Sequence, residues 1–482
     1  MPSRKIFNIG KDRLTTDSIC LIAKNGRRLR LASVTRRMIC RDFEALRAFA
    51  SKHEVYGVTS SLGELLHEPV GESDIVPANV LRSHATGVGA GAPDAWVRAT
   101  ILVKAHQFSL GHSGVNPVVV DCLLKLLERR VVPFVPKYGS VGDGDVAPHA
   151  HIALILIGEG EASHNGRMLN GRGALQAARI HPFRLSNKEA LSLISGTAYS
   201  TAIAALAIQD SYRILDAATV AASVGFEIIE GNRESYSLAL TRLKDVNVRK
   251  IAKRLRKLMR GTSYQRRRLQ DPLSFRCVPQ VHGTVLEILK WADKLVEVEA
   301  NSVADNPVIV GNEVYHGGNF YNSNVAVGAD AVAQGLTYLA GMSERRTQIL
   351  LKKKYTNLPE YLSPGEGDVG MMIAQYSAAA NTARLRTLAT PCGVHSIPTS
   401  GLQEDFVPMT TNACLRLHEC VEVCREVIAI ELCVAAAGLR LKRNYGSIAA
   451  KKIASLTLSD EISKRFIQMQ RLIINGRISK IA

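Results

Sequence analysis

Long apolar segments dominate the chain from about residue 190 onward. Between Ala198 and Val224, apolar residues recur nearly all the way around a helical projection, as expected for a helix that is buried on every side. Glycine and proline clusters then interrupt the pattern and divide the rest into about six to eight long helices. The fold class predicted is mainly α, a bundle of long helices. The breaks fall at Gly261, Asn306-Pro307, Gly317-Gly318, residues 358–365 and residues 390–393.

The first part of the chain has a different character. Residues 30–190 mix short segments with many glycines and prolines, which predicts a smaller, mixed α/β part over residues 1–190 and a helical bundle over residues 191–482. No repeat or low-complexity linker separates the two, so we expect one interlocked body. Wholly apolar helices of this length are hard to cover within one chain, and we therefore also expect an oligomer.

Composition narrows the class of protein. With 482 residues and 46% hydrophobic content, the chain can bury a large core. Its nine cysteines lack the regular spacing of a disulfide framework, which suits a reducing cytoplasm. The first residues lack the apolar core of a secretory signal. The apolar stretch from Thr197 to Ile229 contains charged side chains, so we expect no membrane span and a cytoplasmic protein.

The chain is strongly basic. Lysine and arginine number 61 against 43 acids, a net charge of +18, with a dense cluster between Arg249 and Lys257. Aromatic residues make up only 5% of the chain, and we find neither a known nucleic-acid-binding module nor interleaved stacking aromatics. We therefore expect no specific nucleic-acid partner, and a solvated basic surface that attracts acidic substrates is the simpler interpretation.

Several segments carry more polar residues than packing requires. Residues 138–151 form a glycine-rich turn that runs into an apolar helix, with Asp143 and Asp145 near its beginning. Backbone amides at such a turn can hold an anion. A paired cysteine and histidine pattern at residues 414–424 predicts no metal site, because its two halves point to different faces of a helix.

Four other side chains are candidates for chemistry. Tyr56 is suited to act as a general acid or base, and His84 as a base or an orienting donor. Arg276 could clamp a carboxylate, and Glu404 could hold a substrate cation. Each could instead be a satisfied structural residue. The functional interpretation requires the segments to converge in space, which spacing alone does not establish.

The motifs in these segments resemble those of the histidine and aromatic amino-acid ammonia-lyases, and the resemblance extends from about residue 30 to the C-terminal helices. It implies a mainly α-helical fold, a homotetramer, and sites that draw residues from three chains. The matching motifs are Gly139-Ser-Val-Gly142 followed by Asp145-Val-Ala-Pro148 and His151, Gln270-Asp-Pro-Leu-Ser-Phe-Arg-Cys-Val-Pro-Gln-Val281, Glu299 to Pro307, Gly317 to Phe320, and Gln403-Glu404-Asp405.

The resemblance also implies roles for individual residues. Tyr56 would be the catalytic tyrosine, Arg276 the binder of the substrate carboxylate, and Glu404 a partner of the substrate amine or ring. We expect further residues of these polar segments to take part in catalysis or to bind a small-molecule carboxylate substrate. These are His84, Asp143 and Asp145 for catalysis, and Ser195, Gln270, Asn319 and Phe320 for substrate binding.

One departure from the family pattern affects its chemistry directly. The family makes an electrophilic methylidene-imidazolone by cyclising an Ala-Ser-Gly triad between the glycine and the aspartate of the signature. Here the interval is Asp143-Gly144, which is one residue short and contains no serine. We therefore expect no prosthetic group and no other cofactor. Neighbouring positions also differ from the family: Ser195 stands for asparagine, Leu273 for tyrosine, Thr59 to Gly63 for Asn-Thr-Gly-Phe-Gly, and His149 for an apolar residue. We expect His149 to face the altered site.

The departure changes the expected reaction. An α-amino group is a poor leaving group, so without the electrophile ordinary deamination loses its main source of rate. A leaving group that needs no activation, such as a quaternary ammonium, could still be expelled if Glu404, Asp143 or Asp145 held its charge. Such a reaction resembles that of the trimethylammonium-releasing lyases of the same fold. The alternatives are an isomerase, cyclase or conjugate-addition enzyme acting on an activated biosynthetic intermediate, and a non-catalytic binding or scaffold protein.

Overall fold

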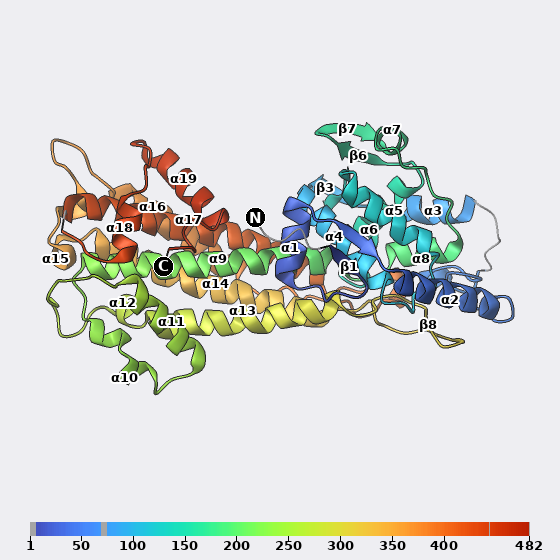
Figure 1. Cartoon of the computed structure of the whole chain (residues 1–482), viewed down its shortest axis with the longest axis horizontal. Coiled ribbons are helices and arrows are strands. Elements are labelled where there is room, and N and C mark those ends of the chain that lie inside the picture. Colours follow the sequence, from blue (N-terminus) through green and yellow to red (C-terminus); the bar gives the residue numbers. More distant parts are fainter. Residues whose placement is uncertain (1–5, 69–74, 443, 482) are drawn as a thin grey trace. The chain divides into compact units, whose positions relative to one another are not determined.

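The apolar stretch after Thr197 forms one long helix, α9 (Ala198–Ile228), in a computed structural model of the chain (Figure 1). The structure describes residues 6–68, 75–442 and 444–481. Nearly all side chains of α9 are buried, which confirms the prediction of a helix covered on every side. In the described part of the chain, only the helical stretch of residues 187–228 is long and apolar enough to cross a membrane, and its apolar window is fully buried.

The chain divides into two compact units, each discontinuous in sequence. The first comprises Met1–Leu206, Asp293–Ala329 and Pro391–Leu415, and the second comprises the remaining residues. The boundary expected at residue 190 would give two units that are each continuous in sequence. In the structure, two later segments of the chain belong to the same unit as its N-terminal part. The helices that contribute residues to both units are α9, α13 (Val278–Ala300), α14 (Ser323–Leu350) and α17 (Thr410–Lys442).

The first unit combines short helices with small sheets. Helix α4 packs on α1 and α5, while α3 packs on α6 and α8. Strands β1 and β2 pair in parallel, and the pairs β3-β5, β4-β6-β7 and β8-β9 are antiparallel. The elements are β1 (Phe7–Ile9), α1 (Thr16–Asn25), β2 (Leu29–Leu31), α2 (Ser33–Ala50), η1 (Gly63–Leu65), α3 (Ile75–His84), β3 (Val88–Gly91), α4 (Asp94–Phe108), α5 (Pro117–Glu128), β4 (Val131–Pro133), β5 (Pro136–Tyr138), α6 (Val146–Leu156), β6 (Glu161–His164), β7 (Arg167–Asn170), α7 (Gly171–Ala177), α8 (Asn187–Ile194), β8 (Val308–Val310), β9 (Glu313–Tyr315) and η4 (Ser400–Leu402).

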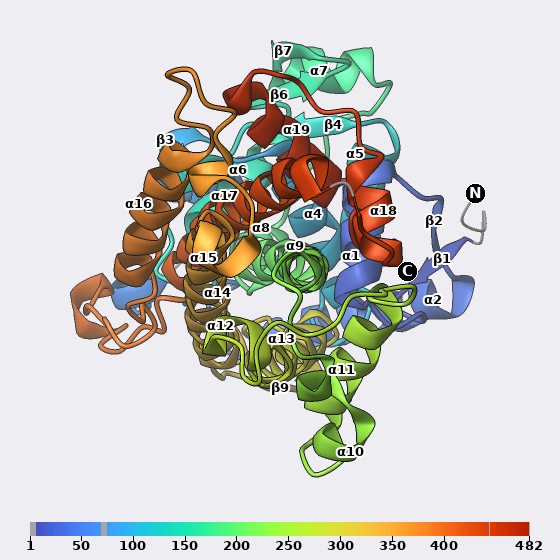
Figure 2. The ribbon, with the colours of Figure 1, turned by 90° about the vertical axis from the view of Figure 1, so that its left-hand side faces the viewer.

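The second unit consists of helices and connecting loops, with no strand among its described residues, and the view along α9 shows that helix among its neighbours (Figure 2). Buried polar contacts link the long helices: Thr219 of α9 bonds His282 of α13, and Arg346 of α14 forms a fully buried ion pair with Glu431 of α17. Removing either partner would destabilise the fold, because the other charge would remain buried without an ion-pair partner. The remaining elements are η2 (Arg233–Tyr236), α10 (Leu238–Thr241), α11 (Val246–Leu258), α12 (Leu273–Arg276), α15 (Lys353–Thr356), η3 (Glu360–Leu362), α16 (Met372–Leu388), α18 (Ile448–Ala454) and α19 (Ile462–Ile474).

Candidate functional site

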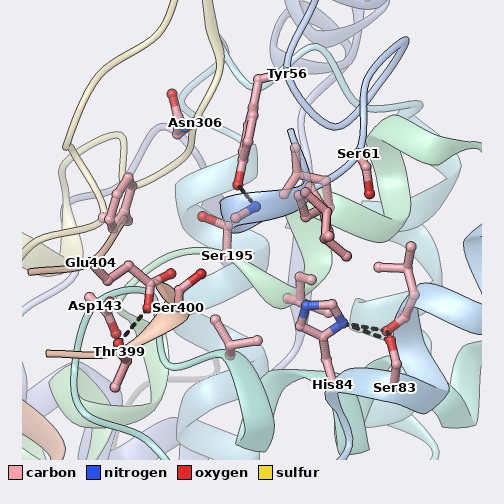
Figure 3. A pocket seen from close by; sticks show the side chains of 18 of the residues that line it. Tyr56, Ser61, Ser83, His84, Asp143, Ser195, Asn306, Thr399, Ser400 and Glu404 are labelled. Atoms are coloured by element: carbon pink, nitrogen blue, oxygen red, sulfur yellow. Dashed lines mark hydrogen bonds between the residues drawn. The ribbon is translucent and has the colours of Figure 1, made fainter. Parts of the chain in front are cut away.

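A cavity of about 740 Å³ in the first unit collects several of the predicted residues (Figure 3). Among the described residues that line it, the ionisable side chains are acids, a tyrosine and a histidine, and none is a lysine or an arginine. The wall of one chain is therefore suited to a cation more than to a carboxylate. The polar lining consists of Tyr56, Ser61, Asn79, Ser83, His84, Ser140, Asp143, Ser195, Asn306, Thr399, Ser400 and Glu404.

Pairing of β3 with β5 brings two distant motifs to this cavity. Strand β3 follows His84 closely, and β5 ends at Tyr138, directly before the glycine-rich loop. At the start of this loop, Gly139 has a φ of 132°, and a Cβ there would stand 3.0 Å from the Cα of Gly87. Only glycine allows this approach of the two backbones. The register of a short sheet thus places His84 and the loop on one cavity.

Asp145 fixes the end of the loop. Its carboxylate is almost fully buried and accepts hydrogen bonds from the hydroxyls of Ser140, Ser200 and Thr411 and from the backbone N–H of Ser200. The residue itself has a left-handed φ of 47° at the start of α6. Because its acceptor oxygens are satisfied and it does not line the cavity, the geometry supports a role for Asp145 in holding the loop rather than in proton transfer.

Helix α8 forms another part of the wall. A capping box fixes its first turn: the Ser186 hydroxyl caps the helix, and the Glu189 carboxylate accepts from the backbone of Ser186. The other end presents Leu191, Ile194 and Ser195 to the cavity. Ser195 is buried, and its backbone carbonyl accepts a hydrogen bond from Lys104. Ser195, which we expect to bind the substrate, thus lies at the cavity.

Tyr56 is held at both its backbone and its hydroxyl. Its backbone N–H donates to His316 Nε2 at 3.2 Å, and its Oη accepts from the Gly63 N–H at 2.8 Å (Figure 3). Burial raises the pKa of Tyr56, the Gly63 N–H lowers it, and the negative charge of Glu404 raises it further. The tyrosine is therefore protonated at neutral pH in the isolated chain, and a cation near Glu404 would favour the phenolate.

The segment that carries Glu404 packs closely against the one that carries Gly63. A Cβ on Gly63, whose φ is 58°, would lie 2.7 Å from Ser400 Oγ. Residues Thr399 and Glu404 pair as an isolated antiparallel bridge around this turn, and the Thr399 hydroxyl donates to Glu404 Oε2 at 2.7 Å. The Gly63 turn and the Glu404 turn therefore place Tyr56 and Glu404 on one cavity.

Asp143 lies beside Glu404 (Figure 3). Its backbone forms an isolated bridge with Tyr321. Burial, the charge of Glu404 and a side-chain hydrogen bond shared with Glu404 raise the pKa of Asp143 to about 7. Its Oδ2 is buried and has no hydrogen-bond partner among the described residues. Two carboxyl groups that share a proton at neutral pH form a site whose negative charge is not neutralised by the chain itself.

His84 is oriented by its own helix. Its Nδ1 lies 2.7 Å from the Val80 carbonyl oxygen and 3.1 Å from Ser83 Oγ. A carbonyl can only accept, so Nδ1 carries the proton in the neutral ring and Nε2 keeps a lone pair. His84 lines the cavity and is therefore available as a second base.

Not all of the predicted residues line the cavity. Phe320 does, whereas Asn319 is exposed and does not. Gln270 and Arg276 belong to the second unit, where Arg276 donates to Gln270 Oε1 at 2.6 Å. The carboxylate clamp expected from Arg276 is thus not part of the cavity lining in a single chain.

Some residues near the loop were not among the predicted site residues. Lys104 is buried in α4, and burial lowers its pKa to about 8. A lysine within the apolar segment of residues 99–108 is a signal that could have been noticed. His149, a candidate to face the altered site, is fully buried with Nδ1 at 3.2 Å from the Ile194 carbonyl oxygen, and it does not line the cavity. Thr399, which orients Glu404, had no motif to mark it.

Comparison with known proteins agrees with this architecture. Residues 14–459 match the family model described as aromatic amino acid lyase. The chain is 38% identical over 455 residues to histidine ammonia-lyase of Sorangium cellulosum, covering 89% of this chain and 88% of that protein. It superposes on tyrosine aminomutase of Streptomyces globisporus with a TM-score of 0.92 at 26% identity, covering 98% of both chains. Ergothionase of Treponema denticola, at 24% identity and a TM-score of 0.93 over 99% of this chain and 100% of that one, shares the fold. The chain belongs to the aromatic amino acid lyase family.

Proposed function

We propose that this protein is a lyase that eliminates a leaving group needing no covalent activation, such as a trimethylammonium group, from an amino-acid-derived carboxylate. The observation that carries the proposal is the pair of neighbouring carboxyl groups on Asp143 and Glu404, which line the cavity that also holds Tyr56 (Figure 3). A permanent cation placed there would neutralise the pair. The same cation is a leaving group that departs as a neutral amine.

The residues between Gly142 and Asp145 do not fit the family's prosthetic group. They are Asp143 and Gly144, so no serine hydroxyl is present to be lost on cyclisation. The Asp143 backbone pairs with Tyr321 and its carboxyl faces Glu404. We infer that an acidic residue has replaced the electrophile and that no step of the reaction passes through a methylidene-imidazolone.

The proposed elimination removes a proton and an amine from adjacent carbons of the substrate. Tyr56, as its phenolate, takes the proton from the β-carbon, a carbon–carbon double bond forms, and the α-carbon–nitrogen bond breaks with its electron pair leaving on trimethylamine. The products are an α,β-unsaturated carboxylate, the free amine and a neutral tyrosine. The Gly63 N–H favours the phenolate, and the substrate's own cation offsets the opposing charge of Glu404.

The substrate carboxylate needs a cation that this cavity lacks. We propose that Arg276, and with it Gln270, reaches the site from a neighbouring chain of a homotetramer. Arg276 is half-buried, and among the described residues its guanidinium donates a hydrogen bond only to the neutral Gln270 Oε1, while its Nε has no partner; this leaves its charge available to a substrate carboxylate. The proposal needs no nucleic acid, membrane or metal.

Two other functions remain as alternatives. An isomerase or cyclase would use the same base, and His84 with its free Nε2 lone pair would then serve as the partner that returns the proton. A non-catalytic binding protein would not need Tyr56 and His84 together on one cavity with two carboxyls. Both alternatives predict that no amine is released.

A paired substrate panel tests the proposal. Histidine, phenylalanine and tyrosine are assayed beside their Nα-trimethylated forms and ergothioneine, and the ultraviolet absorbance of an α,β-unsaturated acid is followed. We expect product from trimethylated substrates only. Product from free amino acids would contradict the inference about Asp143 and Gly144, while rearranged material without amine release would favour the isomerase, and binding without any turnover the non-catalytic protein.

The intact mass provides an independent check. We expect the purified chain to have the mass of its encoded sequence, because the residues from Gly142 to Asp145 offer no serine to dehydrate. Electrospray mass spectrometry of the intact protein and of the peptide containing Asp143 measures this. A mass lower by two waters, located in that peptide, would show an unforeseen cyclisation and overturn the prediction.

A further inference from the structure

Two adjoining cavities in the first unit share no lining residue with the lyase cavity. Their volumes are about 540 and 580 Å³. Both are lined by Asn25, Gly26, Arg98 and Arg130, and the two neighbouring cavities together are called the basic cleft. It lies between the end of α1, helix α4 and the end of α5.

Positive charge predominates in the basic cleft. Its lining contains five cationic and two acidic side chains, a local excess that none of the motifs explains. The cations are Lys24, Arg27, Arg28, Arg98 and Arg130, and the acids are Asp94 and Glu128.

Arg98 is fixed at the centre of the cleft. Its Nε donates to the Ala23 carbonyl oxygen at 2.8 Å and its Nη1 to that of Leu127 at 3.3 Å. These two carbonyls lie in the last turns of α1 and α5, which a cation stabilises. The third nitrogen, Nη2, lies 3.9 Å from where a Cβ of Gly26 would stand. The absence of a side chain at Gly26 leaves that edge of the guanidinium facing the cleft.

Arg130 adds a second guanidinium to the same cleft. After burial, the charge of Arg130 is the next cause that lowers the pKa of Arg98, which means that the two cations repel each other. Arg130 is exposed and makes no side-chain hydrogen bond to a described residue. The hydrogen bonds to the ends of α1 and α5 explain why an arginine stands at position 98. They do not explain the positive charges of Arg130 and Arg28. An anion between the guanidinium groups would relieve their repulsion.

We propose that the basic cleft binds a small molecule bearing phosphate groups. Arginine guanidiniums match phosphate oxygens in charge and geometry. Ser163 and Asn165 line the same cleft and provide neutral hydrogen-bonding groups. Cationic side chains line both neighbouring cavities, which suits a ligand with more than one anionic group. The proposal is independent of the reaction at the lyase cavity.

Calorimetric titration of the full-length protein with pyrophosphate tests this site. Arg130→Gln is the informative variant because no described hydrogen bond is lost with it, and Arg98→Gln is the second. Arg249→Gln, on the exposed face of α11 in the second unit, is the control with the same charge change. We expect Arg130→Gln to weaken pyrophosphate binding about tenfold or more and the control to change it less than about twofold.

The outcomes separate the site from general attraction to a basic protein. Equal weakening by Arg130→Gln and Arg249→Gln would show diffuse attraction and overturn the proposal, as would the absence of pyrophosphate binding to the unaltered protein. Thermal unfolding of Arg98→Gln with and without pyrophosphate adds a second readout: a stabilisation by ligand equal to that of the unaltered protein would also contradict the site.

Discussion

Tyr56→Phe is expected to lower kcat/KM for the trimethylated substrate about a thousandfold and to leave the fold intact. The change removes only the phenolic oxygen, which is the proposed proton acceptor. Its one described hydrogen bond in the chain is from the Gly63 N–H, so the free energy of unfolding should fall by about 1 kcal/mol at most. Steady-state kinetics and thermal unfolding of the same preparation measure the two effects separately.

The matched control is Tyr376→Phe, which removes the same atom from an exposed tyrosine of α16. It should retain full activity. His84→Gln should lose less activity than Tyr56→Phe if His84 is only a second base. Unchanged turnover in Tyr56→Phe together with a large loss of turnover in His84→Gln would show that His84, and not Tyr56, is the base.

Local patterns in the sequence predicted the elements that need no distant partner to be recognised. The apolar pattern on all sides of the helical projection predicted α9. The glycine-rich turn before an apolar stretch predicted the loop that leads into α6 (Val146–Leu156). In both cases the periodicity of the chain itself determines the element. The mainly α-helical fold is confirmed by the structure and by the fold shared with tyrosine aminomutase.

The function of individual side chains depended on contacts that no local pattern contains. Asp145 resembled a catalytic acid in the sequence, yet it accepts from Thr411, which lies 266 positions along the chain. Whether a carboxylate is free or satisfied depends on such partners. Likewise, the motif around Arg276 predicts a carboxylate binder, but spacing does not say which unit this residue belongs to. The shared hydrogen bond of Asp143 with Glu404 also joins residues from distant segments.

The binding of a quaternary ammonium should strengthen as the pH rises through about 7. The raised pKa of Asp143, about 7, means that the pair with Glu404 carries one negative charge at lower pH and two at higher pH. A permanent cation binds the doubly charged form better, so its binding releases a proton below pH 7. Affinity should rise about tenfold between pH 6 and pH 8 and level off above that. Calorimetry with Nα-trimethylphenylalanine, whose side chain does not titrate in this range, and the inactive Tyr56→Phe variant avoids turnover during the measurement.

Two substitutions in this background distinguish the roles of the carboxyls. Asp143→Asn should make the affinity independent of pH between 6 and 8, because the titrating group is gone. Glu404→Gln should instead move the midpoint to lower pH, because its charge and its shared hydrogen bond both raise the pKa of Asp143; burial, the largest cause, would still hold that pKa above its ordinary value. A neutral analogue with a tert-butyl group in place of trimethylammonium is the matched ligand and should show no such trend. The same pH dependence for the neutral ligand, or an unchanged midpoint in Glu404→Gln, would mean that the pair does not bind the cation, and the leaving-group site would have to lie elsewhere in the cavity.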